Sequence, residues 1–413
     1  MINSVRDYAW GSTTAFSELF DWAPSPSPRA EIWMGAHPTA PSKVLLSDDD
    51  AAVDLETLLD GELPFLLKIL AAERPLSIQA HPTKEHAEAG FAAENAAGLA
   101  ADAPERNYVD ANHKPELIVA ITEFSALCGF RPHAQAHADL TALRGPLVPH
   151  PRALDFLDQL LQHIREEDYA AALDWTLTTA AEDAATAARL LAEHLAGEAD
   201  QEPETVTTTG IAVVSGTLPD TLARITEFFP GDPGLFVALM LNRVDLAPGE
   251  ALFLPAGNLH AYLAGVGVEI MANSNNVLRG GLTPKRIDVA ELLSVAETHV
   301  LPLPRCEPQE IAPGHYLYRP PVEEFQLHRR DLGTQGGTHP FTAQTPSIAV
   351  VVSGAMTAST DSVGEMRLAA GDSVFLRPGE DVTFSAEGPA QLFIAAAADA
   401  ARPAVQQKEA PTR

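Results

Sequence analysis

One segment of the chain, covering positions 252–288, combines side chains that bind metals with side chains that bind anions. His260 and Tyr262 lie two positions apart, so in an extended chain both side chains point to one face. The same segment then supplies Glu269, after a predicted Gly-x-Gly bend at Gly265 and Gly267. Two cations follow, Arg279 and Lys285, which flank a predicted Gly-Gly turn at Gly280 and Gly281. An imidazole, a phenol, a carboxylate and two cations together are typical of a metal site beside an anion site.

A second group of candidate ligands precedes this segment, in the sequence LSIQAHP. Gln79 and His81 also lie two positions apart, and Ser77 shares their face in an extended chain. Further along, Glu116 follows a proline at the start of an apolar run, which is a typical position for a carboxylate ligand. We therefore predict that the side chains of Gln79, His81, Glu116 and His260 converge on one cation.

These four side chains favour zinc among the divalent ions, and four ligands leave a position for water or substrate. With a single ionised carboxylate in the set, a bound Zn²⁺ keeps a net positive charge, attracts an oxyanion and lowers the pKa of a bound hydroxyl. The chain has 14 histidines, so any one of them taken alone is more often a structural residue. The residues by themselves predict a β-sheet metalloprotein with an anionic ligand.

Composition limits the classes of function and location. The chain has 413 residues, of which 46% are hydrophobic and 20% charged, as in an ordinary globular protein of two or three domains. Its net charge of −29 argues against nucleic acid and anionic membrane partners, which need a basic surface. Two cysteines make no disulfide framework, and neither a signal peptide nor a membrane-spanning segment is recognisable, so we expect a cytoplasmic protein.

The order of apolar patterns predicts a mainly β protein with a helical insertion. Short strands alternate with turns in the first part, with a short helix near 55–59 and a helix from about Lys84. Lys68 interrupts a predicted buried strand, where a lysine is usually solvated or paired. Apolar residues recur at helical spacing in the second part. We predict five ranges: β at 1–130, helices at 131–230, β at 231–304, a second β domain at 305–400, and a disordered tail at 401–413.

An internal repeat supports two related β domains. LAPGEALFLPAG ends at Gly257 and LAAGDSVFLRPG ends at Gly379, and the two share Leu, Ala, Gly, Phe, Leu and Gly in the same register. An acidic turn, an apolar strand and a Pro/Gly stop are typical of an antiparallel sandwich or jelly roll. His260 follows the first copy by three positions, whereas Val382 follows the second. We predict that only the first domain carries the metal site.

At these residues the sequence closely resembles the type I mannose-6-phosphate isomerases (phosphomannose isomerases), zinc enzymes of the cupin superfamily. The matching stretches, in the order of the family, are YAWGS, AEIWMGAHPTAPS, LSIQAHP, NHKPE, PAGNLHAYLAG and NVLRGGLTPK. The resemblance covers most of the first 300 residues and weakens in the helical and C-terminal parts. It implies a bicupin fold: a catalytic jelly roll interrupted by a helical domain, and a second cupin without metal.

Carried over residue by residue, the resemblance implies one Zn²⁺ per chain on the four ligands proposed above. It implies a catalytic Arg279 and a pocket lined by Ser77, Lys68, Lys114, Tyr262, Glu269 and Lys285. One departure stands at Asn275, where many family members have Asp and some are proposed to use it in catalysis. Another is Arg286, which replaces a His of the family and suggests added positive charge near a phosphate.

The expected reaction is the interconversion of mannose 6-phosphate and fructose 6-phosphate through an enediolate, in a monomer that serves carbohydrate metabolism such as GDP-mannose biosynthesis. We expect Lys114 and Arg279 to stabilise developing charge, Glu269 or His81 to move protons, and Lys285 with Ser77 to hold the phosphate. Two alternatives stay open at this point. One is a cupin isomerase for another sugar phosphate such as glucose 6-phosphate; the other is a non-catalytic sugar-binding cupin, which Asn275 alone suggests.

Overall fold

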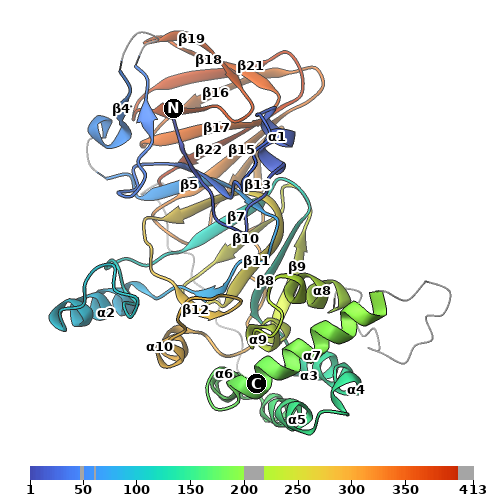
Figure 1. Cartoon of the computed structure of the whole chain (residues 1–413). Coiled ribbons are helices and arrows are strands. Elements are labelled where there is room, and N and C mark those ends of the chain that lie inside the picture. The colour runs from blue at the N-terminus through green and yellow to red at the C-terminus, as the bar shows by residue number, and fades with distance from the viewer. Residues whose placement is uncertain (47–50, 60–61, 200–217, 399–413) are drawn as a thin grey trace, which may run out of the picture.

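The computed structural model describes residues 1–46, 51–59, 62–199 and 218–398. Figure 1 shows a central β-rich part, a second β-rich part packed on one end of it, and a group of helices at the other end. The predicted tail at 401–413 lies outside the described residues. None of the helices within the described ranges is both long and apolar enough to cross a membrane.

The central part is a 10-stranded sheet whose paired strands are antiparallel. Its strands are β1 (Ser4–Arg6), β2 (Glu31–Met34), β5 (Phe65–Ala72), β6 (Ile78–Ala80), β7 (Glu116–Ala120), β8 (Phe124–Phe130), β9 (Leu241–Leu246), β10 (Ala251–Leu254), β11 (His260–Ala272) and β12 (Leu278–Gly281). A separate pair, β3 (Lys43–Val44) and β4 (Val53–Asp54), precedes the 3₁₀ helix Leu55–Leu58, near the predicted short helix. The predicted buried strand with Lys68 is β5, whose residues are all buried.

Strand β11 organises this sheet. Its first half pairs with β6 and β8, and its second half pairs with β5 and β7. The Gly-x-Gly bend expected at Gly265 and Gly267 does not end the strand, because β11 runs through both glycines with one register shift before Gly265. A Cβ atom at Gly265 would lie 2.5 Å from the carbonyl oxygen of Glu123, and its φ is +118°, so this crossing requires glycine.

The helices of the predicted insertion lie between β8 and β9. They are α3 (His133–Ala142), α4 (Arg144–Leu147), α5 (Pro151–Arg165), α6 (Tyr169–Leu177), α7 (Ala181–Ala199), α8 (Leu218–Phe228) and α9 (Gly234–Met240). In α5 the buried residues include Phe156, Leu157, Leu160, Leu161 and Ile164, the spacing of one helical face. All of α9 is buried, as expected for its apolar sequence. The remaining helices are α1 (Ala15–Phe20), α2 (Lys84–Ala96) and α10 (Val289–Val295).

The C-terminal β-rich part consists of a six-stranded and a four-stranded sheet, seen at the top of Figure 1. Its strands are β13 (Gln309–Ala312), β14 (His315–Tyr318), β15 (Gln326–Leu332), β16 (Gly337–Thr342), β17 (Ser347–Ser353), β18 (Ala355–Thr360), β19 (Gly364–Ala369), β20 (Ser373–Leu376), β21 (Asp381–Ala386) and β22 (Ala390–Ala396). An apolar cluster that includes Phe384 and Ile394 fills the space between these two sheets. A second cluster joins this part to the central sheet through residues such as Ile69 and Leu327. Domain boundaries stay a prediction.

The two copies of the sequence repeat adopt the same local conformation. Gly249 and Gly371 have φ values of +90° and +92°, and the glycines that end the two copies have +78° and +81°. In each copy a backbone N–H at the second position donates to the acidic side chain at 2.8 Å. The strand order β1-β2-β5-β11-β7-β10 of the central sheet recurs as β13-β14-β15-β22-β17-β20. Val382 lies in the apolar cluster of the second part, as its sequence position suggested.

Candidate metal and substrate site

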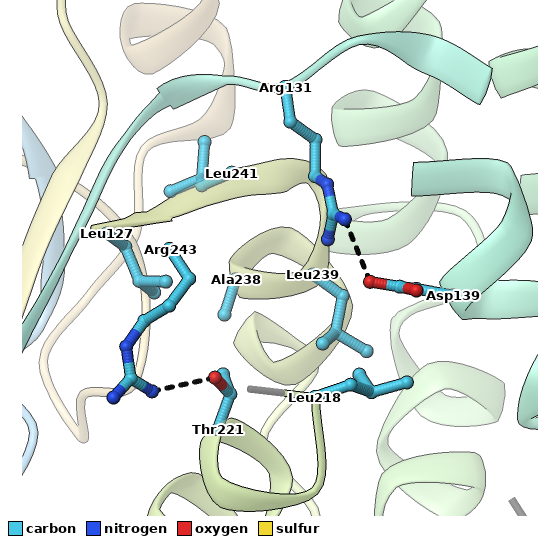
Figure 2. Close-up of a pocket in the computed structure, with 9 residues that line it drawn as sticks. All are labelled: Leu127, Arg131, Asp139, Leu218, Thr221, Ala238, Leu239, Leu241 and Arg243. Carbon is cyan, nitrogen blue, oxygen red and sulfur yellow. Dashed lines mark hydrogen bonds and ion pairs between the residues drawn. The ribbon is translucent and has the colours of Figure 1, made fainter. Parts of the chain in front are cut away.

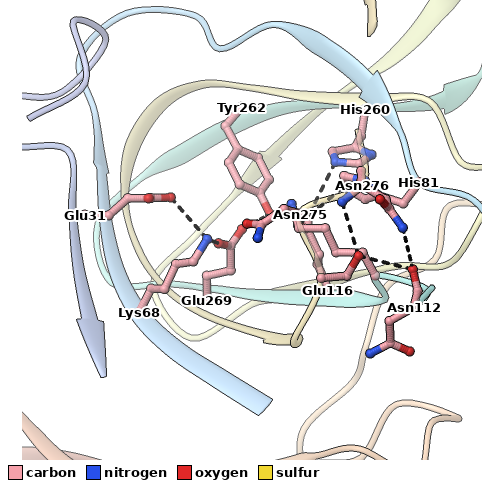
Figure 3. Close-up of polar contacts among 12 residues, drawn as sticks. Glu31, Lys68, His81, Asn112, Glu116, His260, Tyr262, Glu269, Asn275 and Asn276 are labelled. Carbon is pink, nitrogen blue, oxygen red and sulfur yellow. Dashed lines mark hydrogen bonds and ion pairs between the residues drawn. The ribbon is translucent and has the colours of Figure 1, made fainter. Parts of the chain in front are cut away.

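Three strands bring the predicted metal ligands together. His81 follows β6, Glu116 begins β7 and His260 begins β11. The Nε2 atoms of both histidines lie 3.4 Å from the two carboxylate oxygens of Glu116, one histidine to each oxygen. All three side chains are buried, and one ligand atom from each lies within 4.8 Å of the others (Figure 3). Residues that are 179 positions apart in the chain thus share one point in space.

The histidine tautomers suit a metal ion. The Nδ1 atom of His81 lies 2.8 Å from the carbonyl oxygen of Asn276, and that of His260 lies 2.9 Å from the carbonyl oxygen of Asn258. A carbonyl accepts only from an N–H, so both Nε2 atoms carry the lone pair and face Glu116. Both Nε2 atoms and one oxygen of Glu116 are buried without a hydrogen-bond partner among the described residues. A cation with N and O ligands satisfies all three atoms, so the residues fit zinc.

The electrostatics keep His81 and Glu116 in their metal-binding forms. Burial, reinforced by the nearby Lys114 ammonium, lowers the pKa of His81 to about 4. Burial opposes ionisation of Glu116, but Lys114 and the two histidines outweigh it and hold the pKa of this carboxyl well below its usual range. The Nζ atom of Lys114 lies 2.8 Å from a carboxylate oxygen of Glu116. Neutral imidazoles and an ionised carboxylate are the forms that bind metals at neutral pH.

Strand register places Gln79 beside this group. Gln79 on β6 is directly opposite His260 on β11 and directly opposite Arg279 on β12. Side chains of directly opposite residues share a face of the sheet, so the amide lies between the imidazole and the guanidinium. Ligation by Gln79 stays a prediction, which this register supports. The expected Gly-Gly turn is wrong, because Gly280 and Gly281 belong to β12 and the strand ends there.

A buried row of polar side chains extends from the metal group. Lys68 on β5 lies 2.9 Å from Glu269 Oε2 and 3.3 Å from Glu31 Oε1. The hydroxyl of Tyr262 donates to Glu269 Oε1 at 2.9 Å, and Trp33 Nε1 donates to Glu31 Oε2 at 2.7 Å. Figure 3 shows Glu31, Lys68, Glu269 and Tyr262 of this row beside Glu116 and the histidines. The lysine that interrupts an apolar strand is therefore a paired, buried charge.

The row holds one cation between two carboxylates. Burial opposes a charge on Lys68, but Glu269 and Glu31 outweigh it and raise its pKa. Burial raises the pKa of Glu269, and Lys68 counteracts this only in part. Burial also raises the pKa of Tyr262 well above its usual range, so the phenol stays protonated and donates. Both oxygens of Glu269 are thus hydrogen-bonded. Its role in proton transfer stays a prediction.

Two cations form the other end of the site. Burial lowers the pKa of the half-buried Arg279, and the nearness of Arg279 is the main cause that lowers the pKa of the exposed Lys285. Within the described ranges, neither cation has a carboxylate oxygen within 4.0 Å, in contrast to paired arginines such as Arg131, Arg224 and Arg243. Two adjacent cations without a countercharge are a site for an anion. Ser77 is half-buried at the start of the strand that carries Gln79.

The departures from the resembled family have distinct surroundings. Asn275 is exposed, and its backbone N–H donates to Asp110 Oδ2 at 2.8 Å. Arg286 is ion-paired, because it lies 2.8 Å from Asp288 and also donates to the carbonyl oxygen of Glu105. Its suggested contribution of positive charge near a phosphate stays a prediction.

Sequence reasoning missed the residues that orient the ligands. Asn276 supplies the carbonyl that fixes His81, and its amide donates to the carbonyl oxygen of Asp110 at 2.8 Å. Asn258 does the same for His260 through its own carbonyl. Backbone acceptors have no signature of residue type, so no pattern could have identified their role. Glu31 offered a weak signal, as an acidic residue inside the apolar sequence that became β2.

A small hollow lies elsewhere, between the sheet and the helices (Figure 2). Its lining residues are Leu127, Arg131, Asp139, Leu218, Thr221, Ala238, Leu239, Leu241 and Arg243. Arg131 pairs with Asp139 at 2.8 Å, and Arg243 donates to Thr221 at 2.9 Å and pairs with two aspartates. None of the predicted site residues lines this hollow, and its charges are already balanced. This hollow is therefore separate from the candidate metal and substrate site.

Comparisons with known proteins agree with this geometry. The family model for the catalytic domain of phosphomannose isomerase type I matches residues 1–133. Mannose-6-phosphate isomerase of Escherichia coli (strain K12) is 39% identical over 409 residues, covering 94% of this chain and 97% of that protein. The chain belongs to the type I phosphomannose isomerase family. The rat mannose-6-phosphate isomerase is 33% identical over 435 residues, with 94% and 96% coverage.

Solved structures of this family share the fold. A mutant of phosphomannose isomerase from Salmonella typhimurium superposes with a TM-score of 0.78 at 36% identity, covering 96% of this chain and 98% of that one. A mannose 6-phosphate isomerase in its zinc-bound holo form superposes with a TM-score of 0.75 at 35% identity and the same coverage. A mainly β fold with helices is thus common to this chain and to phosphomannose isomerases.

Proposed function

We propose that this protein is a zinc-dependent isomerase that interconverts mannose 6-phosphate and fructose 6-phosphate. The observation that carries the proposal is the buried group of His81, Glu116 and His260, whose unpartnered nitrogen and oxygen atoms face one point beside the cations. The relatives named above are all mannose-6-phosphate isomerases, and they cover nearly the whole chain. These names favour mannose 6-phosphate over the glucose 6-phosphate alternative and an active enzyme over a sugar-binding protein.

One zinc ion per chain would be held by Gln79, His81, Glu116 and His260. When bound, zinc supplies a Lewis acid that polarises substrate oxygens and stabilises negative charge on them. Lys114 would add a second positive charge next to the ion, since its ammonium already lies 2.8 Å from Glu116. The enediolate of an aldose-ketose conversion carries a new negative charge at the reacting carbons, so both positive charges lower its energy relative to the uncharged carbonyl form.

The phosphate of the substrate would bind at the cationic end, on Lys285 and Ser77 with Arg279 between the phosphate and the reacting carbons. The main support is electrostatic: an anion here removes the mutual repulsion of Arg279 and Lys285, which lowers the pKa of Lys285. The guanidinium offers a planar fork of N–H donors that suits either phosphate or enediolate oxygens. Anchoring of the non-reacting phosphate fixes C1 and C2 against the metal group and so reduces the entropic cost of reaction.

Proton transfer between C2 and C1 would fall to Glu269. Its pKa is raised by burial, which brings a carboxyl toward the range in which it both accepts and returns a proton near neutral pH. Tyr262 and Lys68 orient it from either side. His81 is less suited to this part, because Asn276 occupies its Nδ1 and its Nε2 faces Glu116. Asn275 has no ionisable group, so it would contact the substrate as a neutral amide.

The finer architecture belongs to this proposal too. The matching strand orders and repeat turns support a bicupin, in which 1–130 and 231–304 form the catalytic cupin and 131–230 a helical domain inserted into it. The range 305–400 would be the metal-free cupin, where Ser347 stands opposite the repeat strand as Glu116 does in the first. The monomeric state, the cytoplasmic location and a part in GDP-mannose biosynthesis remain predictions from the sequence and the family.

The decisive experiment is a coupled assay of mannose 6-phosphate conversion to fructose 6-phosphate, with and without a chelator. We expect activity that the chelator removes and added Zn²⁺ restores, and little turnover of glucose 6-phosphate in a parallel assay. His260→Ala should lose both bound zinc, measured by elemental analysis, and turnover. Full activity in zinc-free His260→Ala protein would refute the ligand assignment, and stoichiometric zinc without turnover of either sugar would favour a binding protein.

The phosphate end is tested by Lys285→Gln. Loss of one of two phosphate-binding cations should raise KM for mannose 6-phosphate about 10-fold or more with a smaller change in kcat, because a charge-assisted contact contributes roughly 1.5–3 kcal/mol. Arg286→Gln is the matched control, since this neighbouring cation already pairs with Asp288. An unchanged KM in Lys285→Gln would remove its anchoring role.

A further inference from the structure

A second cluster of polar side chains lies inside the C-terminal sandwich. His315 on β14, His328 and Arg330 on β15 and His339 on β16 bring three imidazoles and a guanidinium together from the two facing sheets. His315 Nε2 lies 3.0 Å from His328 Nδ1, and the rings of His315 and His339 are 4.6 Å apart, edge to face. None of these residues belongs to the metal and substrate site.

Strand register shows that the cluster faces the interior. His328 is directly opposite Ile394 on β22, and Arg330 is directly opposite Leu392. Ile394 and Leu392 both belong to the apolar cluster between the two sheets, and opposite residues share a face. From the other sheet, His339 is directly opposite Phe384 of the same apolar cluster. A group of polar side chains thus interrupts an otherwise apolar interior.

The cluster occupies the place that corresponds to the catalytic polar row. The repeat makes Leu376 equivalent to Leu254, so Ser347, opposite Leu376, corresponds to Glu116, opposite Leu254. Two strands further, this register aligns His328 with Lys68. On the strand between, Met271 pairs with Glu116 and Ala396 pairs with Ser347, so Ala396 corresponds to Met271. Two residues earlier on that strand, Glu269 pairs with Lys68 and Ile394 pairs with His328, so His328 corresponds to Lys68.

One more strand completes the correspondence. Glu31 lies opposite Leu70, and His315 lies opposite Arg330, so His315 corresponds to Glu31. The hydrogen bond between His315 and His328 therefore stands where the Lys68–Glu31 ion pair stands in the catalytic part. The second β-rich part has kept a polar pocket position and changed its chemistry from metal and carboxylate to imidazole and guanidinium.

Two buried polar atoms of the cluster lack partners among the described residues. His339 is 3% exposed, and its Nε2 has no hydrogen-bond partner among the described residues. The Nε of Arg330 is also buried and unpartnered, although its Nη1 donates to the carbonyl oxygen of Pro313. Buried polar atoms of this kind are uncommon without a ligand or water, because each loses its solvation. Two independent atoms, from facing sheets, point to a ligand.

The charge of the cluster selects the class of ligand. Arg330 is a cation beside His315 and His339 and lowers the pKa of both, with burial as the larger cause. A divalent cation would be repelled by this guanidinium, and the group of ligand atoms that converges within the described part of the chain is the catalytic one. An anion instead gains a charge-assisted contact with Arg330 and N–H donors from neutral imidazoles.

We propose that the C-terminal sandwich binds a small oxyanion, inorganic phosphate or a phosphate monoester, between Arg330 and the imidazoles of His315 and His339. Such a site would let a phosphorylated metabolite bind the enzyme at a place separate from the substrate pocket. The apolar cluster that joins the two β-rich parts includes Leu327 of β15, which is the residue beside His328. An anion bound at the histidines is therefore connected through β15 to the catalytic sheet.

The test is titration of the zinc-loaded protein with inorganic phosphate by isothermal calorimetry, with the number of sites as the readout. We expect two sites per chain in the unaltered protein, one in Arg330→Met and one in Arg279→Met. Arg367→Met, an exposed arginine on the same part of the chain, is the matched control and should keep two. His339→Phe provides a second route, since the ring volume is kept and the N–H donor is lost; it should weaken the second site at least 10-fold.

The outcomes are separable. Two results would overturn the inference. The first is a single site in the unaltered protein, removed by Arg279→Met and kept in Arg330→Met. The second is a count of two sites in both Arg330→Met and His339→Phe. If the unaltered protein has a single site that is removed by Arg330→Met and kept in Arg279→Met, the inference is supported. The same result counts against phosphate binding at Arg279 and Lys285 in the proposed function. Thermal unfolding of each variant identifies a folding failure, and the other substitution then decides the result.

Discussion

Replacement of Lys68 by methionine isolates the contribution of the buried polar row. The ammonium lies 2.9 Å from Glu269 and 3.3 Å from Glu31, and all three side chains are at most 7% exposed. Methionine fills a similar volume and leaves two buried carboxyl groups without their countercharge. Removal of one partner from a buried ion pair costs about 3–5 kcal/mol, far more than a surface pair contributes. We expect Lys68→Met to reduce the free energy of unfolding by this amount at pH 7.

The pH dependence gives a sharper signature. The pKa of Glu269 is already raised by burial, and Lys68 opposes that rise, so the substitution raises it further. A carboxyl that keeps its proton in the folded state but not in the unfolded state makes the folded state lose stability as pH rises. The loss is about 1.4 kcal/mol per pH unit for each such carboxyl above the unfolded pKa, near 4.3. The destabilisation should therefore grow from pH 6 to pH 8.

The assay is urea unfolding of both proteins, followed by tryptophan fluorescence at pH 6, 7 and 8. The difference between variant and parent is the relevant quantity, because effects of pH on zinc binding are common to both. Lys84→Met is the matched control: Lys84 is exposed and 3.8 Å from Glu88, so less than about 0.5 kcal/mol is expected at every pH. A Lys68→Met difference below about 1 kcal/mol, or one that stays constant from pH 6 to pH 8, would refute a buried charged row.

Two further substitutions test local contacts of the site. Tyr262→Phe removes the donor to Glu269 and should cost about 1–3 kcal/mol of unfolding free energy and lower kcat, with zinc content unchanged; equal stability and kcat would contradict the hydrogen bond. Gly281→Ala places a Cβ 2.4 Å from the Cα of Gly234 at a φ of +140°, so we expect more than about 2 kcal/mol of destabilisation by denaturant unfolding. Gly388→Ala has open space around its Cβ and should change stability by less than about 1 kcal/mol; equal losses in the two alanine variants would show that close packing is not the cause.

Much of the site could be predicted because its residue types are rare and closely spaced. The pairs Gln79 with His81 and His260 with Tyr262 each mark one face of a strand, and the structure brings His81 and His260 together at Glu116. The repeat also predicted two copies of one turn, because glycine is the residue that adopts positive φ without strain. Strand limits were predicted less well: the glycine pairs were taken as a bend and a turn, whereas β11 and β12 include them where two backbones approach closely.

The sequence by itself determined the types of candidate ligand, the helical segment and the duplicated turn, since these depend on residue identity and local spacing. The tertiary structure alone decided which carbonyls fix the imidazoles, that Lys68 lies between Glu31 and Glu269, and that His315 and His328 take the corresponding places in the second sandwich. Those facts depend on which strands become neighbours and in what register. Register is set by burial of whole sheet faces across distant segments, so no local pattern specifies it.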